Sequence, residues 1–189
     1  MIHIVRNVMR AIVVWIYYRV GWIRAGWLGI SLDWRARISP KARLRGVASI
    51  GDAEIGADVE IGKGSYVASG VIQSARIGRY CSIGPGVIIG PTEHRLDHWT
   101  TSPYEARDAG EGAGVTDRAK TAPVIGDGVW LGAKVIVLRG VTIGARAAVA
   151  AGAVIVRDVP AGELWGGVPG HMLSRTRFQP DLRDPKNSS

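Results

Sequence analysis

Aliphatic side chains recur every six positions over two long stretches of the chain, and this period restricts the fold more than any other feature. Between residues 124 and 160 the series is unbroken: Ile125, Leu131, Val137, Ile143, Val149 and Ile155. A small or β-branched residue stands four positions after each of them. The same template fits residues 55–67 and 77–89, and a less regular version begins at residue 38. A period of six matches neither an α-helix nor a simple alternating strand.

A six-residue repeat suits a short extended segment followed by a corner. Three such segments close one triangular turn with the aliphatic side chains inside. Each turn pairs its backbone with the next at about 4.8 Å, so several turns must stack before a stable core exists. Composition agrees, because 26 glycines serve the corners and a single phenylalanine, Phe178, leaves a narrow aliphatic core. The pattern therefore predicts an all-β solenoid.

The second stretch also resembles a known family. Residues 124–170 read VIGDGVWLGAKVIVLRGVTIGARAAVAAGAVIVRDVPAGELWGGVPG, which is similar to the hexapeptide-repeat acyltransferases. The resemblance implies a left-handed parallel β-helix, a handedness opposite to the usual rule for parallel connections. We expect the β-helix over residues 35–160 with a protruding loop at 91–123. A basic amphipathic helical segment precedes it at 1–34, and a cap segment and tail follow at 161–189.

The repeat stops between residues 90 and 124, and a break of this length is usually functional or disordered. Its first part, EHRLDHWTTSPY at residues 93–104, resembles the loop of the xenobiotic and sugar O-acetyltransferase branch. The resemblance implies that His94 is catalytic, with Asp97 or a backbone carbonyl fixing its tautomer. Glu93, where the family often has asparagine, and Tyr104 are the candidate contacts to the acceptor.

The chemistry supports the same histidine independently. Attack of a hydroxyl on a thioester needs a base, and histidine has the side-chain pKa closest to neutral pH. Backbone N–H groups can stabilise the developing oxyanion, and no protein nucleophile is needed when both substrates bind together. Cys81 occupies a small-residue position of its repeat, so we expect it to be packed in the core. His98 and His94 alone do not complete a zinc site, so we expect no metal.

In the resembling enzymes acetyl-CoA lies in the groove between neighbouring subunits of a homotrimer. The family signature Val-Trp-[Ile/Leu]-Gly stands here at residues 129–132, and Trp130 occupies an outward position that a subunit, the acceptor or the CoA arm would cover. The small residues at 132, 150 and 151 would let the pantetheine arm approach the backbone, or would simply pack at corners of the solenoid. The arginines at 175 and 177 would contact the 3′-phosphate of CoA, or would lie on a solvated helix surface. The candidate cofactor contacts are Trp130, Gly132, Ala150, Ala151, Arg175 and Arg177.

Charge is concentrated at the amino terminus. Residues 1–45 hold nine Lys or Arg and one acidic residue, Asp33, so the whole net charge of +8 lies there. Apolar residues at helical spacing predict an amphipathic helix with a break near Gly21 or Gly26; they are Ile2, Val5, Met9, Ile12, Ile16, Val20 and Ile23. Such a helix can cap the solenoid, pack in a trimer or make peripheral contact with an anionic membrane through residues 1–45. Nucleic-acid binding is not expected, because the rest of the chain is neutral.

The longest charge-free apolar run, residues 11–18, is far shorter than the roughly 20 residues that span a bilayer. No small-residue cleavage site follows it. We expect a cytoplasmic protein, free or at the inner face of the membrane. The predicted function is acetyl-CoA-dependent O-acetylation of a sugar hydroxyl in a cell-surface polysaccharide or its precursor. The alternatives are xenobiotic (antibiotic) O-acetylation, amino-sugar N-acetylation, and a non-catalytic β-helix scaffold.

Overall fold

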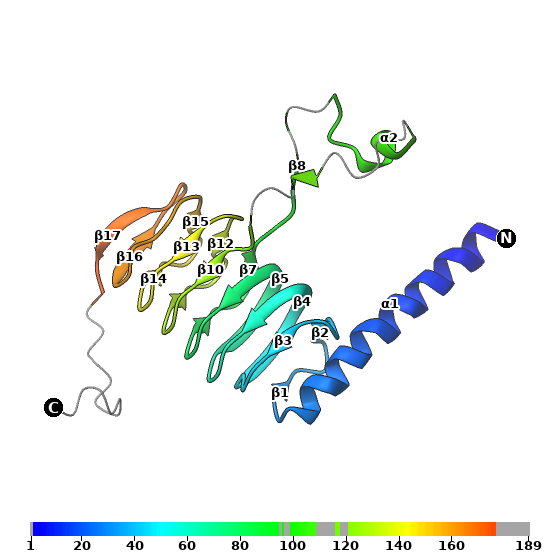
Figure 1. Ribbon diagram of the computed structural model, residues 1–189, viewed down its shortest axis with the longest axis horizontal. Coiled ribbons are helices and arrows are strands. Elements are labelled where there is room, and N and C mark those ends of the chain that lie inside the picture. The colour runs from blue at the N-terminus through cyan, green and yellow to red at the C-terminus, as the bar shows by residue number, and fades with distance from the viewer. Residues whose placement is uncertain (1, 95, 97–98, 109–115, 118–120, 177–189) are drawn as a thin grey trace.

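The predicted solenoid is confirmed. The computed structural model describes residues 2–94, 96, 99–108, 116–117 and 121–176. One long helix, α1 (Ile2–Trp27), leads into a left-handed β-helix of about seven turns. The turns stack along one axis, with α1 at one end and the final hairpin at the other (Figure 1).

Parallel strands form three faces of the solenoid. The first face contains β1 (Ser31–Leu32), the starts of β4 (Ser49–Ile61) and β5 (Tyr66–Ile77), β6 (Ser82–Ile83), β11 (Trp130–Leu131), β14 (Ala148–Val149) and β16 (Glu163–Gly166). The second face contains β2 (Arg37–Ile38), the middles of β4 and β5, β7 (Val87–Ile89), β12 (Ile136–Val137) and β15 (Val154–Ile155). The third face contains β3 (Arg43–Leu44), the ends of β4 and β5, β10 (Val124–Ile125) and β13 (Thr142–Ile143).

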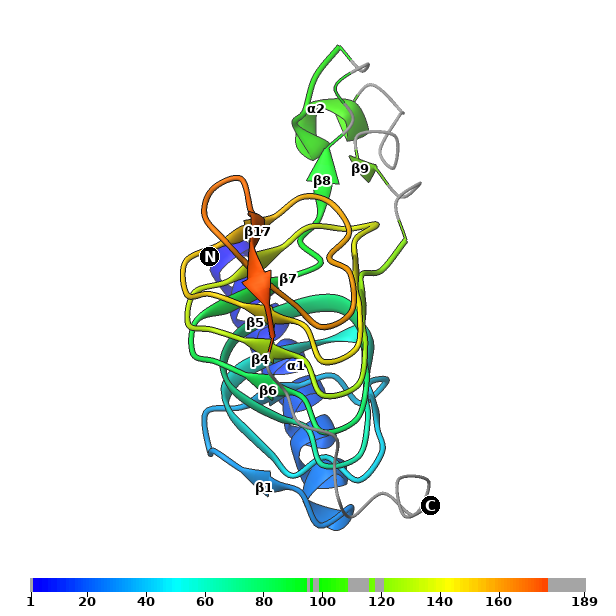
Figure 2. The same cartoon turned by 90° about the vertical axis from the view of Figure 1, so that its left-hand side faces the viewer.

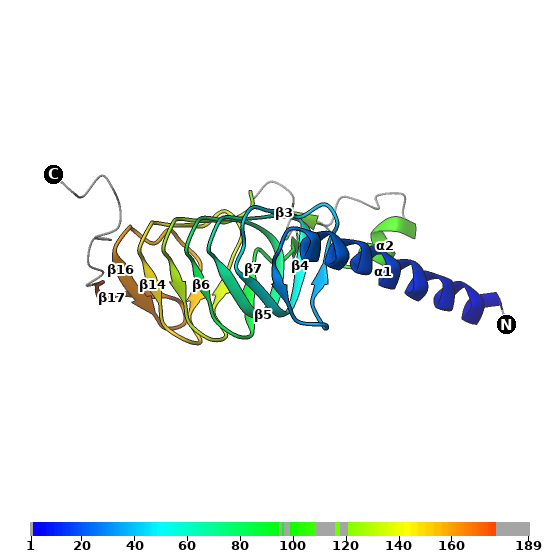
Figure 3. The ribbon, with the colours of Figure 1, turned by 90° about the horizontal axis from the view of Figure 1, so that it is seen from below.

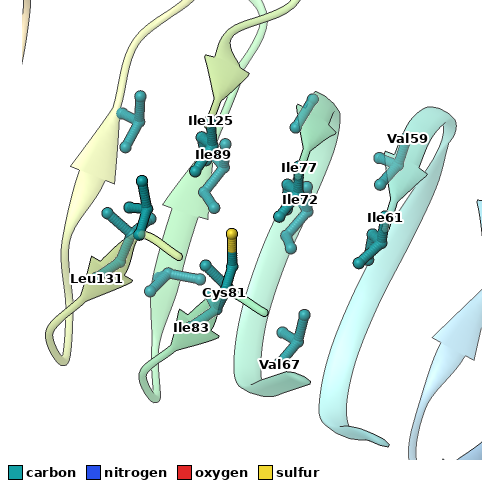
Figure 4. Packing of buried hydrophobic residues seen from close by; sticks show 14 of the residues in the cluster. Val59, Ile61, Val67, Ile72, Ile77, Cys81, Ile83, Ile89, Ile125 and Leu131 are labelled. Atoms are coloured by element: carbon teal, nitrogen blue, oxygen red, sulfur yellow. The ribbon is translucent and has the colours of Figure 1, made fainter. Parts of the chain in front are cut away.

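The six-residue period follows from this geometry. In most of the two-residue strands of the solenoid, the second residue points inward and is buried, as Leu131 and Val137 are, and the residue before it is more exposed, as Trp130 and Ile136 are. The inward side chains of successive turns stack in rows, mostly isoleucine and valine, with Cys81 among them (Figure 4). Corners need left-handed backbone at positions such as Gly128 and Gly152, which explains part of the glycine content.

The repeat is interrupted at the corner between the second and third faces. After β7 the chain leaves the solenoid through Gly90 and forms β8 (Glu93–His94), α2 (Pro103–Asp108) and β9 (Thr116–Asp117). This insertion projects well beyond the solenoid (Figures 1 and 2). The chain returns at β10, which pairs with the end of β5, so the stacking of turns continues across the insertion.

The predicted break in α1 is wrong, because the helix is continuous from Ile2 to Trp27. Gly21 lies where the helix meets the first turn: a β-carbon built there would collide with the carbonyl group of Ile38. A glycine therefore serves close packing here and does not end the helix. The last turns of α1 pack on the first turn of the solenoid, and its first half extends past it (Figure 3). No helix among the described residues is long and apolar enough to cross a membrane.

The opposite end of the solenoid is closed by a hairpin. The last strand, β17 (His171–Arg175), pairs antiparallel with β16 after a turn that contains a cis peptide bond between Val168 and Pro169. Trp165 on β16 fills the end of the core, and its indole N–H donates to Glu163 at 2.8 Å.

Candidate active site

Both ends of the insertion are tied to the solenoid. At the outgoing end, the backbone N–H and the hydroxyl of Thr92 donate to the amide oxygen of Gln73 at 2.7 and 3.0 Å. Next to it the Ser74 hydroxyl, itself contacted by Arg139 at 3.0 Å, donates to the carbonyl of Gly90 at 3.4 Å. At the returning end, the carbonyl of Pro123 accepts from the Arg76 N–H at 2.9 Å. The start of the loop is therefore held at a fixed place on the corner.

His94 lies on β8, two residues after the contact with Gln73. In the ladder with β9, Glu93 is opposite Asp117 and His94 is opposite Thr116. The side chain of His94 is exposed and that of Glu93 is half-buried. A base for a solute acceptor must be reachable from solvent, and His94 meets this requirement.

The other loop residues are placed in part. Tyr104 stands on α2 with its side chain exposed. Asp97, the predicted orienting carboxylate, lies outside the described residues, as does His98. Among the residues that the structure describes, no three His, Cys, Asp or Glu side chains cluster as metal ligands.

Most of the predicted cofactor contacts lie together on another part of the solenoid. Trp130 is on the first face with its side chain 48% exposed, in register with Ala148, which in turn pairs with Leu164. Ala150 and Ala151 form the following corner, between the first and second faces. Gly132 lies at this corner one turn earlier, but a β-carbon there would come within 2.6 Å of the Ala151 nitrogen. Close stacking of the turns therefore explains Gly132.

This corner also offers hydrogen-bond donors. Ala151 is exposed, and within the described part of the chain neither its N–H nor that of Ala133, one turn earlier, makes a hydrogen bond. Two backbone N–H groups without a partner among the described residues, beside small side chains, fit an extended amide-containing arm such as pantetheine.

Arg175 ends β17, opposite Glu163 of β16, and its side chain is exposed. It lies on a strand, so the expected alternative of a solvated helix surface is wrong for this residue. Arg177 lies outside the described residues. Because β17 continues the first face beyond β16, Arg175 and Trp130 belong to the same face.

One chain does not bring the two groups together. His94 projects from the corner between the second and third faces, whereas Trp130 and Arg175 lie on the first face, which is opposite that corner in a three-sided solenoid. His94 and the predicted cofactor contacts therefore lie on different sides of the molecule.

Cys81 is confirmed as a packed core residue. It is fully buried, and its thiol donates to the carbonyl of Gly126 at 3.1 Å. Burial raises the pKa of the Cys81 thiol. A buried neutral thiol is a poor nucleophile.

The loop-holding residues Gln73, Ser74 and Arg139 were not predicted from the sequence. One signal was present: Ile72 and Ile77 are five positions apart instead of six. The second face is connected to the third by a tighter corner there, and Ser74 is buried in it.

Residues 122–157 match the family described as bacterial transferase hexapeptide (six repeats). A probable macrolide acetyltransferase from Lysinibacillus sphaericus is 33% identical over 106 residues, which are 52% of this chain and 58% of that protein. The chain spans about half the length of the curated relatives that it matches.

Solved structures agree with the fold. A hexapeptide-repeat-containing acetyltransferase from Vibrio cholerae is 30% identical, with 73% of this chain and 72% of that chain covered and a TM-score of 0.54. Its complex with acetyl-CoA covers 82% and 74% at 27% identity, also with a TM-score of 0.54. A mutant perosamine N-acetyltransferase from Caulobacter crescentus, in complex with CoA and GDP-perosamine, is 27% identical over 77% and 53% of the two chains, with a TM-score of 0.51. The chain belongs to the family of hexapeptide-repeat acetyltransferases.

Proposed function

We propose that this protein is an acetyl-CoA-dependent O-acetyltransferase that acts on a sugar hydroxyl of a cell-surface polysaccharide or its precursor. The observation that carries the proposal is the placement of His94. It is exposed, yet it lies two residues beyond the Thr92–Gln73 contact and is paired in the β8–β9 ladder. A base held in this way loses little entropy when the acceptor binds.

His94 acts as the general base. Its unprotonated ring nitrogen takes the proton of the acceptor hydroxyl while the hydroxyl oxygen forms a bond to the thioester carbonyl carbon. The carbon–sulfur bond breaks, and His94 returns the proton to the departing thiolate, so the products are the acetyl ester and free CoA. Bound acetyl-CoA supplies the activated acyl group. Cys81 takes no part, because it is buried and neutral.

The first face is the proposed binding surface for acetyl-CoA. The N–H groups of Ala133 and Ala151 would bond the pantetheine amides, and Ala150 leaves room for the arm. Trp130 would cover part of it, and Arg175 would pair with a phosphate by a charge-assisted hydrogen bond. The acetyl-CoA complex of the Vibrio cholerae relative supports this choice of co-substrate.

A homotrimer would complete the site. His94 and the first face are on opposite sides of one chain, so the loop of one subunit must meet the first face of another. The second face carries an outward row of aliphatic side chains over four turns that favours burial against a second subunit; these are Val71, Ile88, Ile136 and Val154. Glu93 and Tyr104 would contact the acceptor beside His94.

A second candidate is O-acetylation of a xenobiotic, favoured by the similarity to a probable macrolide acetyltransferase. N-acetylation of an amino sugar is the third, favoured by the perosamine enzyme. A panel of sugars, nucleotide-linked amino sugars and antibiotics, with release of free thiol as the readout, separates the three. If CoA does not raise the melting temperature, the protein is a non-catalytic scaffold.

The decisive variant is His94→Ala. We expect kcat to fall by roughly 10²–10⁴-fold, the usual contribution of a general base, while the thermal shift with CoA stays unchanged. His3→Ala, which removes another histidine, on α1 and outside both proposed binding surfaces, is the matched control and should keep full activity. Full turnover by the His94→Ala protein would remove His94 from the mechanism.

A further inference from the structure

The apolar stripe that the sequence places on α1 does not pack on the solenoid. Its members from Val5 to Ile23 are all exposed, Ile12 by 45% and Ile23 by 52%. The helix contacts the first turn through a different side, with Gly21 against Ile38 and the indole N–H of Trp22 on the carbonyl of Asp33 at 2.9 Å. The stripe is therefore available to something outside this chain.

The apolar surface is also wide. Ile4, Val8 and Trp15 are exposed beside the stripe, so at 3.6 residues per turn the apolar arc of residues 4–16 covers about 200° of the helix. Arg6 and Arg10 occupy the remaining side. A coiled-coil seam uses about two positions in seven, so one neighbouring helix would leave most of this arc uncovered. A flat lipid surface could cover the whole apolar arc.

The charges around the arc have one sign. Three arginines of the first turn are paired with acidic residues of the second, Arg35 with Asp52 at 3.9 Å, Arg37 with Glu54 at 3.1 Å and Arg45 with Glu60 at 3.8 Å. The ion pairs among the described residues include none of the arginines of α1. The helix thus keeps its positive charge beside its apolar surface.

Aromatic side chains lie where the helix joins the solenoid. A groove of about 480 Å³ between α1 and the first turn is lined by Trp15, Tyr18 and Trp34 together with arginines. The guanidinium group of Arg19 stacks on Trp15, 5.6 Å from the ring centroid, and that of Arg35 lies 5.1 Å from Trp34. Tryptophan and tyrosine are enriched at the headgroup level of membranes.

We propose that α1 binds the surface of a bilayer containing anionic phospholipid, with its apolar arc in the acyl boundary and its arginines on the lipid phosphates. A helix with a broad apolar side and a basic polar side lies in the membrane plane. This inference does not depend on the proposed acetyl transfer, because every residue that it uses is on α1 or the first turn. It fixes the amino-terminal end of the solenoid at the membrane.

The test is co-sedimentation of the full chain with vesicles. Vesicles of equimolar phosphatidylglycerol and phosphatidylcholine should bind the protein at least tenfold more tightly than phosphatidylcholine alone, and added salt should weaken the binding. Ile12→Glu and the double reversal Arg6→Glu/Arg10→Glu should each reduce the affinity by about tenfold or more. Val156→Glu and Lys63→Glu/Lys134→Glu make the same charge changes elsewhere on the solenoid and should bind as the parent does.

Sedimentation velocity without lipid distinguishes the main rival, a second copy of this chain on the arc. If Ile12→Glu lowers the oligomeric state and leaves vesicle binding intact, the arc is a subunit interface and the proposal is overturned. Equal binding to both kinds of vesicle also overturns it. An unchanged oligomeric state together with lost binding to the anionic vesicles supports it.

Discussion

An ion pair between Arg79 and Asp127 joins the two halves of the solenoid across the insertion. The backbone N–H, Nε and Nη2 of Arg79 donate to the Asp127 carboxylate at 2.7, 3.0 and 2.7 Å, although the residues are 48 positions apart. These hydrogen bonds from Arg79 hold the pKa of Asp127 below its ordinary value. The pair therefore favours the folded state as long as Asp127 is ionised.

The sign of the pH effect follows from that lowered pKa. The stabilisation is complete above the ordinary carboxyl pKa of about 4 and is lost as the pH falls through the lower folded value. Asp127→Asn should lower the free energy of unfolding at pH 7 by no more than about 1 kcal/mol, because both side chains are partly exposed. The difference from the parent in thermal denaturation should shrink below pH 4. Asp58→Asn, at an exposed carboxylate elsewhere on the solenoid, is the control, and a pH-independent difference for Asp127→Asn would contradict the assignment.

The sequence predicted the burial of residues that occupy equivalent positions in successive repeats. It did not predict the contacts of residues that make one specific tertiary interaction. The position of Cys81 in its repeat predicted burial, and the position of Trp130 predicted a side chain that points out of the solenoid; both are confirmed. The contact of Gln73 with Thr92 depends on the path of the chain at one irregular corner. No periodic signal encodes that contact.

For the helix α1, the sequence likewise predicted the local structure and not the tertiary contacts. Its spacing of apolar residues correctly predicted a helix, because periodicity reports local structure. It did not predict which side packs, because the docking side is chosen by the small residue Gly21 and by hydrogen bonds of Trp22 and Arg24. The most apolar side of α1 does not pack on the solenoid and stays exposed.

Two glycines of α1 give a matched pair for testing this docking. A β-carbon at Gly21 would collide with the Ile38 carbonyl, whereas at Gly26 it would meet nothing within 4 Å. Gly21→Ala should therefore displace the helix and lower the melting temperature. Gly26→Ala should raise stability by up to about 1 kcal/mol through helix propensity alone. Thermal denaturation followed by circular dichroism measures both, and equal effects of the two substitutions would argue against the docking.

For the whole molecule, the period predicted a stacked solenoid, but the handedness came from the family resemblance and not from the spacing. The separation of His94 from the first face could not be predicted, because it depends on which corner the insertion interrupts. Under the proposed mechanism that corner has a consequence for assembly: His94 lies on one side of the chain and Trp130 on the other, so the proposed site would need two subunits.

Mixing two inactive proteins tests this directly. His94→Ala lacks the base, and Ala151→Trp should block the proposed CoA corner, so each should be inactive alone. In trimers reassembled from equal amounts, a site is intact when an Ala151→Trp subunit contributes the loop and a His94→Ala subunit contributes the first face, which gives about a quarter of the parental activity. The control is the double variant His94→Ala/Ala151→Trp mixed with the parent, which shows how far the subunits exchange under these conditions. If both sides of the site came from one subunit, no mixture of the two single variants would recover activity, and the intersubunit site would be excluded.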